Sequence, residues 1–112
     1  MYNFFYFFGM HYSYSDNLSD VEGVEVNKFP TVFGDERGQY LELFNLNIDK
    51  SYNFKQISVV HNVPNIIRGM HGDWGTSKKV GILTGHIRQV LLDCRVNSKT
   101  YGLCASTDLI SS

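Results

Sequence analysis

From Val21 onward, apolar and polar residues alternate with a period of two, which is the pattern of strands that bury one face. No segment of ten or more residues carries the apolar stripe that an amphipathic helix needs. We therefore predict an all-β fold with strands at residues 21–26, 38–46, 53–61, 65–71, 78–84 and 86–95. Short strands at this spacing are typical of an antiparallel sandwich or barrel.

The composition suits one globular domain with a modest core, since 43% of the 112 residues are hydrophobic and 14% are aromatic. Lys and Arg number 10 against 11 Asp and Glu, which gives a net charge of -1. This balance provides no basic field to attract nucleic acid or an anionic membrane, and neither is predicted as a partner. An anionic ligand would have to be bound by a few local cations.

The two cysteines, Cys94 and Cys104, form no metal-type pair, so neither a disulfide framework nor a zinc site is indicated and a cytoplasmic location is expected. The start "MYNFFYFFGM" has no Lys or Arg before Lys28 and is too short to span a bilayer, which argues against a signal peptide. We expect residues 1–20 to form an N-terminal edge strand or a loop, with residues 21–112 as the main domain.

Most of the chemically active side chains lie within residues 66–95. If Gly85 begins a two-residue type II′ turn, the strands on either side of it pair and Lys78 lies opposite Asp93. If the preceding strand closes across the glycine-rich loop, His71 lies opposite Lys78 at about 5 Å. These registers predict a base, a cation and a carboxylate in one apolar concavity.

Arg68 lies three residues before His71, so strict alternation would point the two side chains to opposite faces. A glycine inside a strand favours a β-bulge, and Gly69 lies between them. One extra residue there would turn Arg68 toward the face that His71 occupies. We therefore include Arg68 in the predicted pocket.

Several motifs follow in a fixed order: "FGDERGQYLELF", "FKQ", "IIRGMH", a lysine seven residues after His71, and "VLLDCRVNSKTYG". By this order and spacing, from about Val24 to Gly102, the chain resembles the dTDP-4-dehydrorhamnose 3,5-epimerase family of nucleotide-sugar enzymes. The loop "HGDWGTSK" is more similar to the branch that acts on related 4-keto sugars, including other nucleotides or heptoses.

The resemblance implies a cupin-type antiparallel jelly roll, usually a homodimer, that works without a metal or other cofactor. Its substrate would be a nucleotide-linked 4-keto-6-deoxy hexose or heptose of deoxysugar and surface-polysaccharide biosynthesis. Protons alpha to the 4-keto group are removed and then returned on the opposite face, at carbon 3, carbon 5 or both.

The residues suit this chemistry. An imidazole, with an ordinary pKa of about 6.5, accepts a proton near neutral pH, so His71 is the predicted base. An ammonium stabilises the enolate that develops more than it stabilises the neutral ketone, and Lys78 is predicted for that role. Arginine matches a phosphate with two parallel hydrogen bonds. The predicted substrate-binding residues, which also match the family, are Arg37, Glu42, Gln56 and Arg68.

The sequence departs from the family pattern in several places. Ser58 and Val60 replace the usual Asn and Ser, and Gln89 stands where the rhamnose enzymes have Asp. The family's opposing acid, a tyrosine, and the aspartate that pairs with its histidine would fall after Ser112. We therefore expect a C-terminally truncated jelly roll, inactive or incomplete by itself, in which Tyr40 and Tyr101 are the nearest substitutes for the acid.

Other functions and structural roles remain open. His71 could be a structural histidine, Lys79 could take the place of Lys78, and Arg37 could form a surface ion pair with Glu42. Asp93 and Arg95 could likewise be structural partners at a strand end. Other classes are a sugar-binding or assembly domain without activity, a related 3,4-ketoisomerase, and a metal-dependent cupin. The metal ligands would be His61, His71, Asp73 and His86, although "HGD" stands where such cupins have two histidines separated by one residue.

Overall fold

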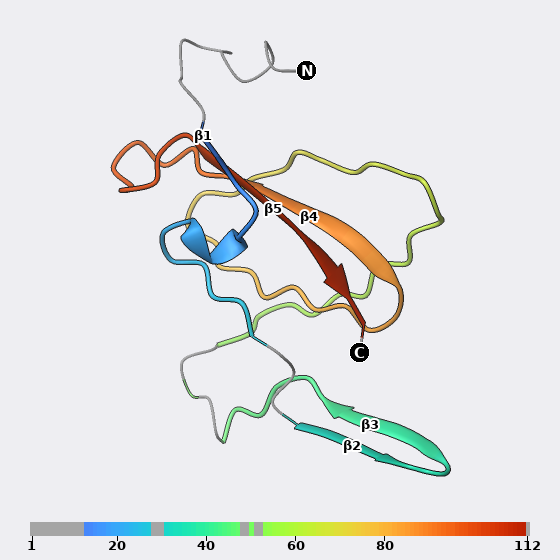
Figure 1. The fold of residues 1–112 in the computed structure, drawn as a ribbon. Helices are drawn as coiled ribbons and strands as arrows, with labels where there is room; N and C mark the ends of the chain where they lie inside the picture. The colour runs from blue at the N-terminus through green and yellow to red at the C-terminus, as the bar shows by residue number, and fades with distance from the viewer. Residues whose placement is uncertain (1–12, 28–30, 48–49, 51–52, 112) are drawn as a thin grey trace. The chain divides into compact units, whose positions relative to one another are not determined.

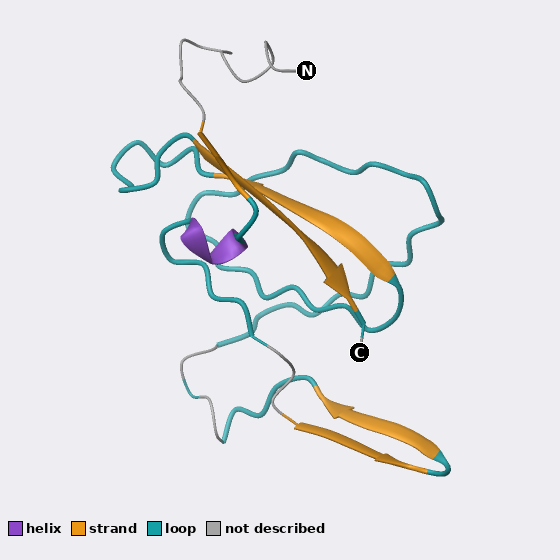
Figure 2. Ribbon diagram, in the orientation of Figure 1, coloured by secondary structure: helices purple, strands orange, loops and turns teal. Residues whose placement is uncertain are grey.

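The computed structural model describes residues 13–27, 31–47, 50 and 53–111. Contacts divide these residues into two units, which are described separately. The first unit comprises the described residues of 1–28 and 81–112, and the second comprises those of 29–80. Figures 1 and 2 show the elements, which are β1 (Ser13–Ser15), η2 (Leu18–Asp20), β2 (Thr31–Asp35), β3 (Gly38–Glu42), β4 (His86–Leu92) and β5 (Leu103–Ile110).

The predicted all-β class is confirmed. Five of the six elements found in the described part of the chain are strands, and the other is the short 3-10 helix η2. The strands form two open sheets, which is consistent with a cupin-like fold. No helix among the described residues is long and apolar enough to cross a membrane.

The first unit is a three-stranded sheet in the order β1-β5-β4. Strand β4 is antiparallel to β5, from His86 opposite Ile110 to Leu92 opposite Cys104. Strand β1 is parallel to β5 and pairs Ser13 with Leu103, so the two ends of the described chain share one sheet. Within residues 1–20, where an edge strand or a loop was expected, β1 lies at one edge of this sheet. The aromatic run at residues 1–10 lies outside the described residues.

A small core lies against this sheet. Leu18 and Val21, in and just after η2, are each 5% exposed, and Ala105 of β5 is fully buried. The side chain of Asn17 caps η2 by accepting a hydrogen bond from the backbone N–H of Ser19 at 3.1 Å. Along β4, exposed and half-buried residues alternate from His86 to Leu91, so the period of two predicted this strand correctly.

The hairpin predicted at Gly85 is wrong. Residues 78–84 form no strand, and β4 pairs with β5 instead. Gly85 and Ser111 close this ladder, because each backbone N–H is donated to the other residue, at 3.0–3.1 Å. Segment 103–110 instead pairs antiparallel with β4 over seven residues and satisfies the backbone groups along that edge of the strand.

The second unit contains the hairpin of β2 and β3, whose two-residue turn is formed by Glu36 and Arg37 within the "FGDERGQYLELF" motif. After β3, the rings of Phe44 and Phe54 pack with centroids 4.7 Å apart. Residues 53–80 follow as turns and extended loops without a ladder. Three predicted strands are therefore wrong, because they form no ladder with another strand of the described chain: 21–26, 53–61 and 65–71. Alternation of polar and apolar residues does not by itself provide a hydrogen-bonding partner for the backbone.

Candidate functional site

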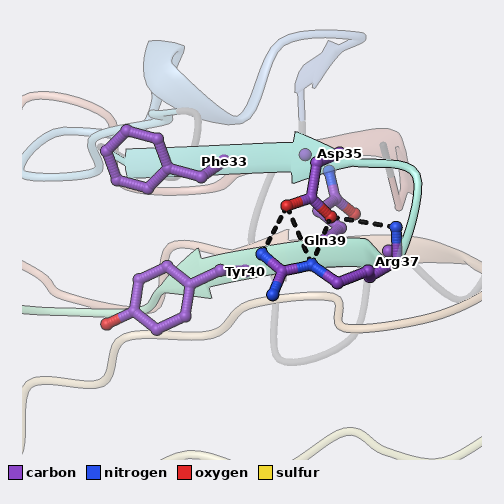
Figure 3. Close-up of a pocket in the computed structure, with 7 residues that line it drawn as sticks. Phe33, Asp35, Arg37, Gln39 and Tyr40 are labelled. Atoms are coloured by element: carbon purple, nitrogen blue, oxygen red, sulfur yellow. Dashed lines mark hydrogen bonds and ion pairs between the residues drawn. The ribbon is translucent and has the colours of Figure 1, made fainter.

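The turn of the β2–β3 hairpin holds Arg37 (Figure 3). The Asp35 carboxylate accepts hydrogen bonds from the backbone N–H, Nε and Nη2 of Arg37, the shortest at 2.5 Å from Nη2. These bonds hold the pKa of Asp35 below its usual value. The Arg37 side chain is 84% exposed, so its outer N–H groups face solvent. The suggested ion pair of Arg37 with Glu42 is corrected to a pair with Asp35.

A shallow pocket lies on this hairpin and is formed by its own residues. Phe33 and Tyr40 face each other across the two strands, with ring centroids 6.3 Å apart, and Figure 3 shows them at the end away from the turn. The Asp35–Arg37 pair lies at the turn end. The complete lining is Phe33, Gly34, Asp35, Arg37, Gly38, Gln39 and Tyr40.

Glu42 ends β3, and its side-chain Oε1 is buried without a hydrogen-bond partner among the described residues. A buried oxygen in this state costs free energy until a donor reaches it. Further along, Gln56 Nε2 donates to Ser58 Oγ at 3.2 Å, so these two side chains lie together. Both Glu42 and Gln56 belong to the predicted substrate-binding set.

Arg68 lies in an extended loop, where its Nε donates to the side-chain oxygen of Asn62 at 2.6 Å. A guanidinium has five N–H donors, and this bond uses one of them. Gly69 adopts a φ of 132°, a backbone conformation that favours glycine. The predicted β-bulge is nevertheless wrong, because residues 65–71 form no ladder in which a bulge could occur.

The loop from His71 to Lys78 brings charged groups together. Lys78 Nζ lies 2.7 Å from Asp73 Oδ2, and both side chains are about half exposed. The pKa of Asp73 is lowered, first by the hydrogen bond from Lys78, then by the Lys78 charge, and more weakly by the charge of His71. Gly75, with a φ of 75°, provides the turn between the two ends of the ion pair.

The predicted pairing of Lys78 with Asp93 is therefore wrong. The loop still pairs the predicted cation with a carboxylate, but the carboxylate is Asp73, which was predicted only as a possible metal ligand. An aspartate and a lysine at the two ends of a short glycine-containing loop were the available signal. Tyr40 lies on the β2–β3 hairpin, and Tyr101 lies in the turn before β5 in the first unit.

Asp93 has a structural role in the first unit. Its side chain is only 3% exposed and accepts hydrogen bonds from Arg95 Nε and Nη2 at 2.9 Å, from Ser98 Oγ at 2.6 Å and from Thr100 Oγ1 at 2.7 Å. These donors, above all Arg95, hold its pKa far below the usual range despite burial. The suggested structural pairing of Asp93 with Arg95 is confirmed.

Glu22 joins this network from a distant part of the sequence. Its backbone oxygen accepts a hydrogen bond from Arg95, and its carboxylate accepts bonds from the Lys99 N–H at 2.7 Å and from Ser98 Oγ at 2.9 Å. A hydroxyl carries one hydrogen, so Ser98 donates to Glu22 or to Asp93 at any moment. The "DCRVNSKTYG" motif is therefore a loop organised around buried Asp93.

The described residues contain no group of three or more His, Cys, Asp and Glu side chains that could hold a metal ion. Cys94 and Cys104 are free thiols. Cys94 is exposed, whereas Cys104 lies in the sheet, and burial raises the pKa of its thiol.

Known proteins match most of this chain. The family model for dTDP-4-dehydrorhamnose 3,5-epimerase matches residues 19–112. The enzyme of that name from Salmonella typhimurium is 32% identical over 88 residues, which cover 71% of this chain and 48% of the relative. Its namesake from Methanothermobacter thermautotrophicus is 35% identical over 79 residues, which cover 65% and 43% of the two chains.

A further relative of the same name, from Escherichia coli, is 32% identical over 81 residues, which cover 65% of this chain and 44% of the relative. The chain thus spans about half the length of the curated relatives it matches. No solved structure matches it.

Proposed function

Because the chain belongs to the dTDP-4-dehydrorhamnose 3,5-epimerase family, we propose that it takes part in epimerising a nucleotide-linked 4-keto sugar. The substrate class is a 4-keto-6-deoxy hexose or heptose of deoxysugar and surface-polysaccharide biosynthesis, and the working form is a cytoplasmic homodimer. The reaction removes a proton alpha to the ketone and returns one on the opposite face, without a cofactor.

The observation that carries this proposal is the loop in which Lys78 binds Asp73 and the charge of His71 acts on the same carboxylate. In the proposed reaction, the neutral imidazole of His71 takes the proton beside the ketone. The electron pair left on carbon moves toward the carbonyl oxygen, which becomes an enolate. The Lys78 ammonium stabilises this oxygen because its negative charge is largest after the proton has left.

Substrate binding is proposed for Arg37, Glu42, Gln56 and Arg68. The exposed guanidinium of Arg37 and the four N–H groups of Arg68 that do not bind Asn62 suit the diphosphate of a nucleotide sugar. The buried Glu42 Oε1 would accept a hydrogen bond from a sugar or base N–H or O–H, which would remove the cost of leaving it unpaired.

The test is to incubate the chain in deuterated water with 4-keto-6-deoxy nucleotide sugars and to follow deuterium incorporation by mass spectrometry. The proposal expects deuterium at a carbon alpha to the ketone, and NMR of the product then separates exchange from inversion of that carbon. Binding without exchange would instead favour a sugar-binding domain that lacks activity. Exchange that stops with a chelator and returns with added metal would favour a metal-dependent cupin.

Lys78→Met is expected to lower kcat for this exchange by at least about 10²-fold, the scale for losing one donor to an oxyanion. KM should change much less, because the ammonium acts on charge that develops in the transition state. The matched control is Lys79→Met, which removes the neighbouring charge and should have little effect. Equal and small effects of the two substitutions would assign the enolate partner to another residue.

A further inference from the structure

The Asp73–Lys78 pair differs in surroundings from the ion pairs of Asp93 and Asp35. Asp93 is surrounded by Arg95, Ser98 and Thr100 in a buried loop. Asp35 is bound by Arg37, which reaches it from within the same turn. Asp73 instead binds a residue proposed to touch the reacting atoms, and it lies two residues from the proposed base.

We propose that Asp73 is a positioning residue of this site, which holds the Lys78 ammonium in place through the 2.7 Å contact. This inference rests on the proposed function. Lysine has a flexible four-carbon side chain, and fixing it costs conformational entropy. A carboxylate that restricts the ammonium before substrate arrives removes part of that cost from the chemical step.

The pairing leaves Lys78 able to act on substrate. An ammonium has three N–H donors, so one bond to Asp73 leaves two for the enolate oxygen. Both side chains are about half exposed, so a ligand can approach the pair.

The first measurement needs no substrate. An amine-reactive reagent modifies lysines at a rate that falls when the ammonium is held in an ion pair, and mass spectrometry of peptides gives the rate for each lysine. The rate for Lys78, divided by the rate for Lys55 in the same protein, should be about two to five times higher in Asp73→Asn than in wild type. This factor corresponds to the free energy of an exposed ion pair. Asp108→Asn removes a carboxylate bound to Arg88 and should leave the Lys78 rate unchanged. An unchanged Lys78 rate in Asp73→Asn would overturn the pairing.

The second measurement is deuterium exchange into the 4-keto sugar. Asp73→Asn should lower kcat by about 10-fold to 10²-fold, the scale for a misplaced catalytic group, with KM changed less than about twofold. Asp73→Glu keeps the charge and should recover most of the rate. Full activity in Asp73→Asn, or no recovery in Asp73→Glu, overturns the positioning role even if the labelling shows the pair. A wild-type chain that exchanges nothing overturns the proposed function, and the role of Asp73 in catalysis falls with it.

Discussion

His71→Asn is expected to lower the rate of deuterium exchange into a 4-keto nucleotide sugar by about 10²-fold to 10⁴-fold, the usual contribution of a general base. Asparagine has nearly the width of the imidazole and keeps a polar side chain in the loop, but it cannot accept the proton. The loss should fall on kcat rather than on KM, since substrate affinity is assigned to other residues. Initial rates by mass spectrometry at several substrate concentrations measure both constants.

The matched control is His61→Asn, which removes another exposed histidine from the same unit. We expect its exchange rate to stay within about twofold of wild type, as for a surface substitution outside the site. If both variants exchange as fast as wild type, His71 is a structural residue. If His61→Asn alone loses activity, the base has been assigned to the wrong histidine.

Asp93→Asn is expected to lower the free energy of unfolding by about 2–4 kcal/mol. Each side-chain partner of Asp93, namely Arg95, Ser98 and Thr100, donates to it, so both carboxylate oxygens accept. An asparagine offers one accepting oxygen and places an N–H₂ group against the remaining donors. The loss should stay below that of a fully buried broken ion pair because Arg95 is half exposed. Urea unfolding at neutral pH measures it.

This difference should shrink in acid. The pKa of Asp93 is depressed in the folded state, so its contribution is complete above the unfolded value near 3.8 and is lost as pH falls toward the folded pKa. Wild type should therefore lose stability below about pH 4, whereas Asp93→Asn loses less over the same range. Urea midpoints at successive pH values test this convergence, and a constant gap would contradict it.

Asp108→Asn is the control for these unfolding experiments. Asp108 lies in the same sheet and forms an ion pair with Arg88 at 3.0 Å, but both side chains are about half exposed. Exposed pairs contribute less than about 1 kcal/mol, so this variant should unfold close to wild type. A loss as large as that of Asp93→Asn would show that burial does not distinguish the two aspartates.

Local sequence determined the all-β class and some of the strands. Strand β4 alternates exposed and half-buried residues from His86 to Leu91, and the predicted strand at residues 86–95 contains it. Strand β5 was missed because it lies between two neighbours and buries residues on successive positions, such as Cys104 and Ala105, which hides the alternation. Alternation of polar and apolar residues also predicted strands at 53–61 and 65–71, but these segments have no neighbouring strand to pair with in the described part of the chain.

For the site, the sequence determined which residue types occur and in what order, and these were enough to identify the family. Their partners were decided by tertiary structure. Whether Lys78 forms an ion pair with Asp73 or with Asp93 depends on the backbone path through Gly75 and on which strand pairs with β4. Neither can be deduced from the spacing of residues along the sequence. Strand β4 pairs with 103–110 over seven residues, which satisfies the backbone N–H and C=O groups along one of its edges, whereas residues 78–84 lie outside the sheet and Lys78 pairs with Asp73 within its own loop.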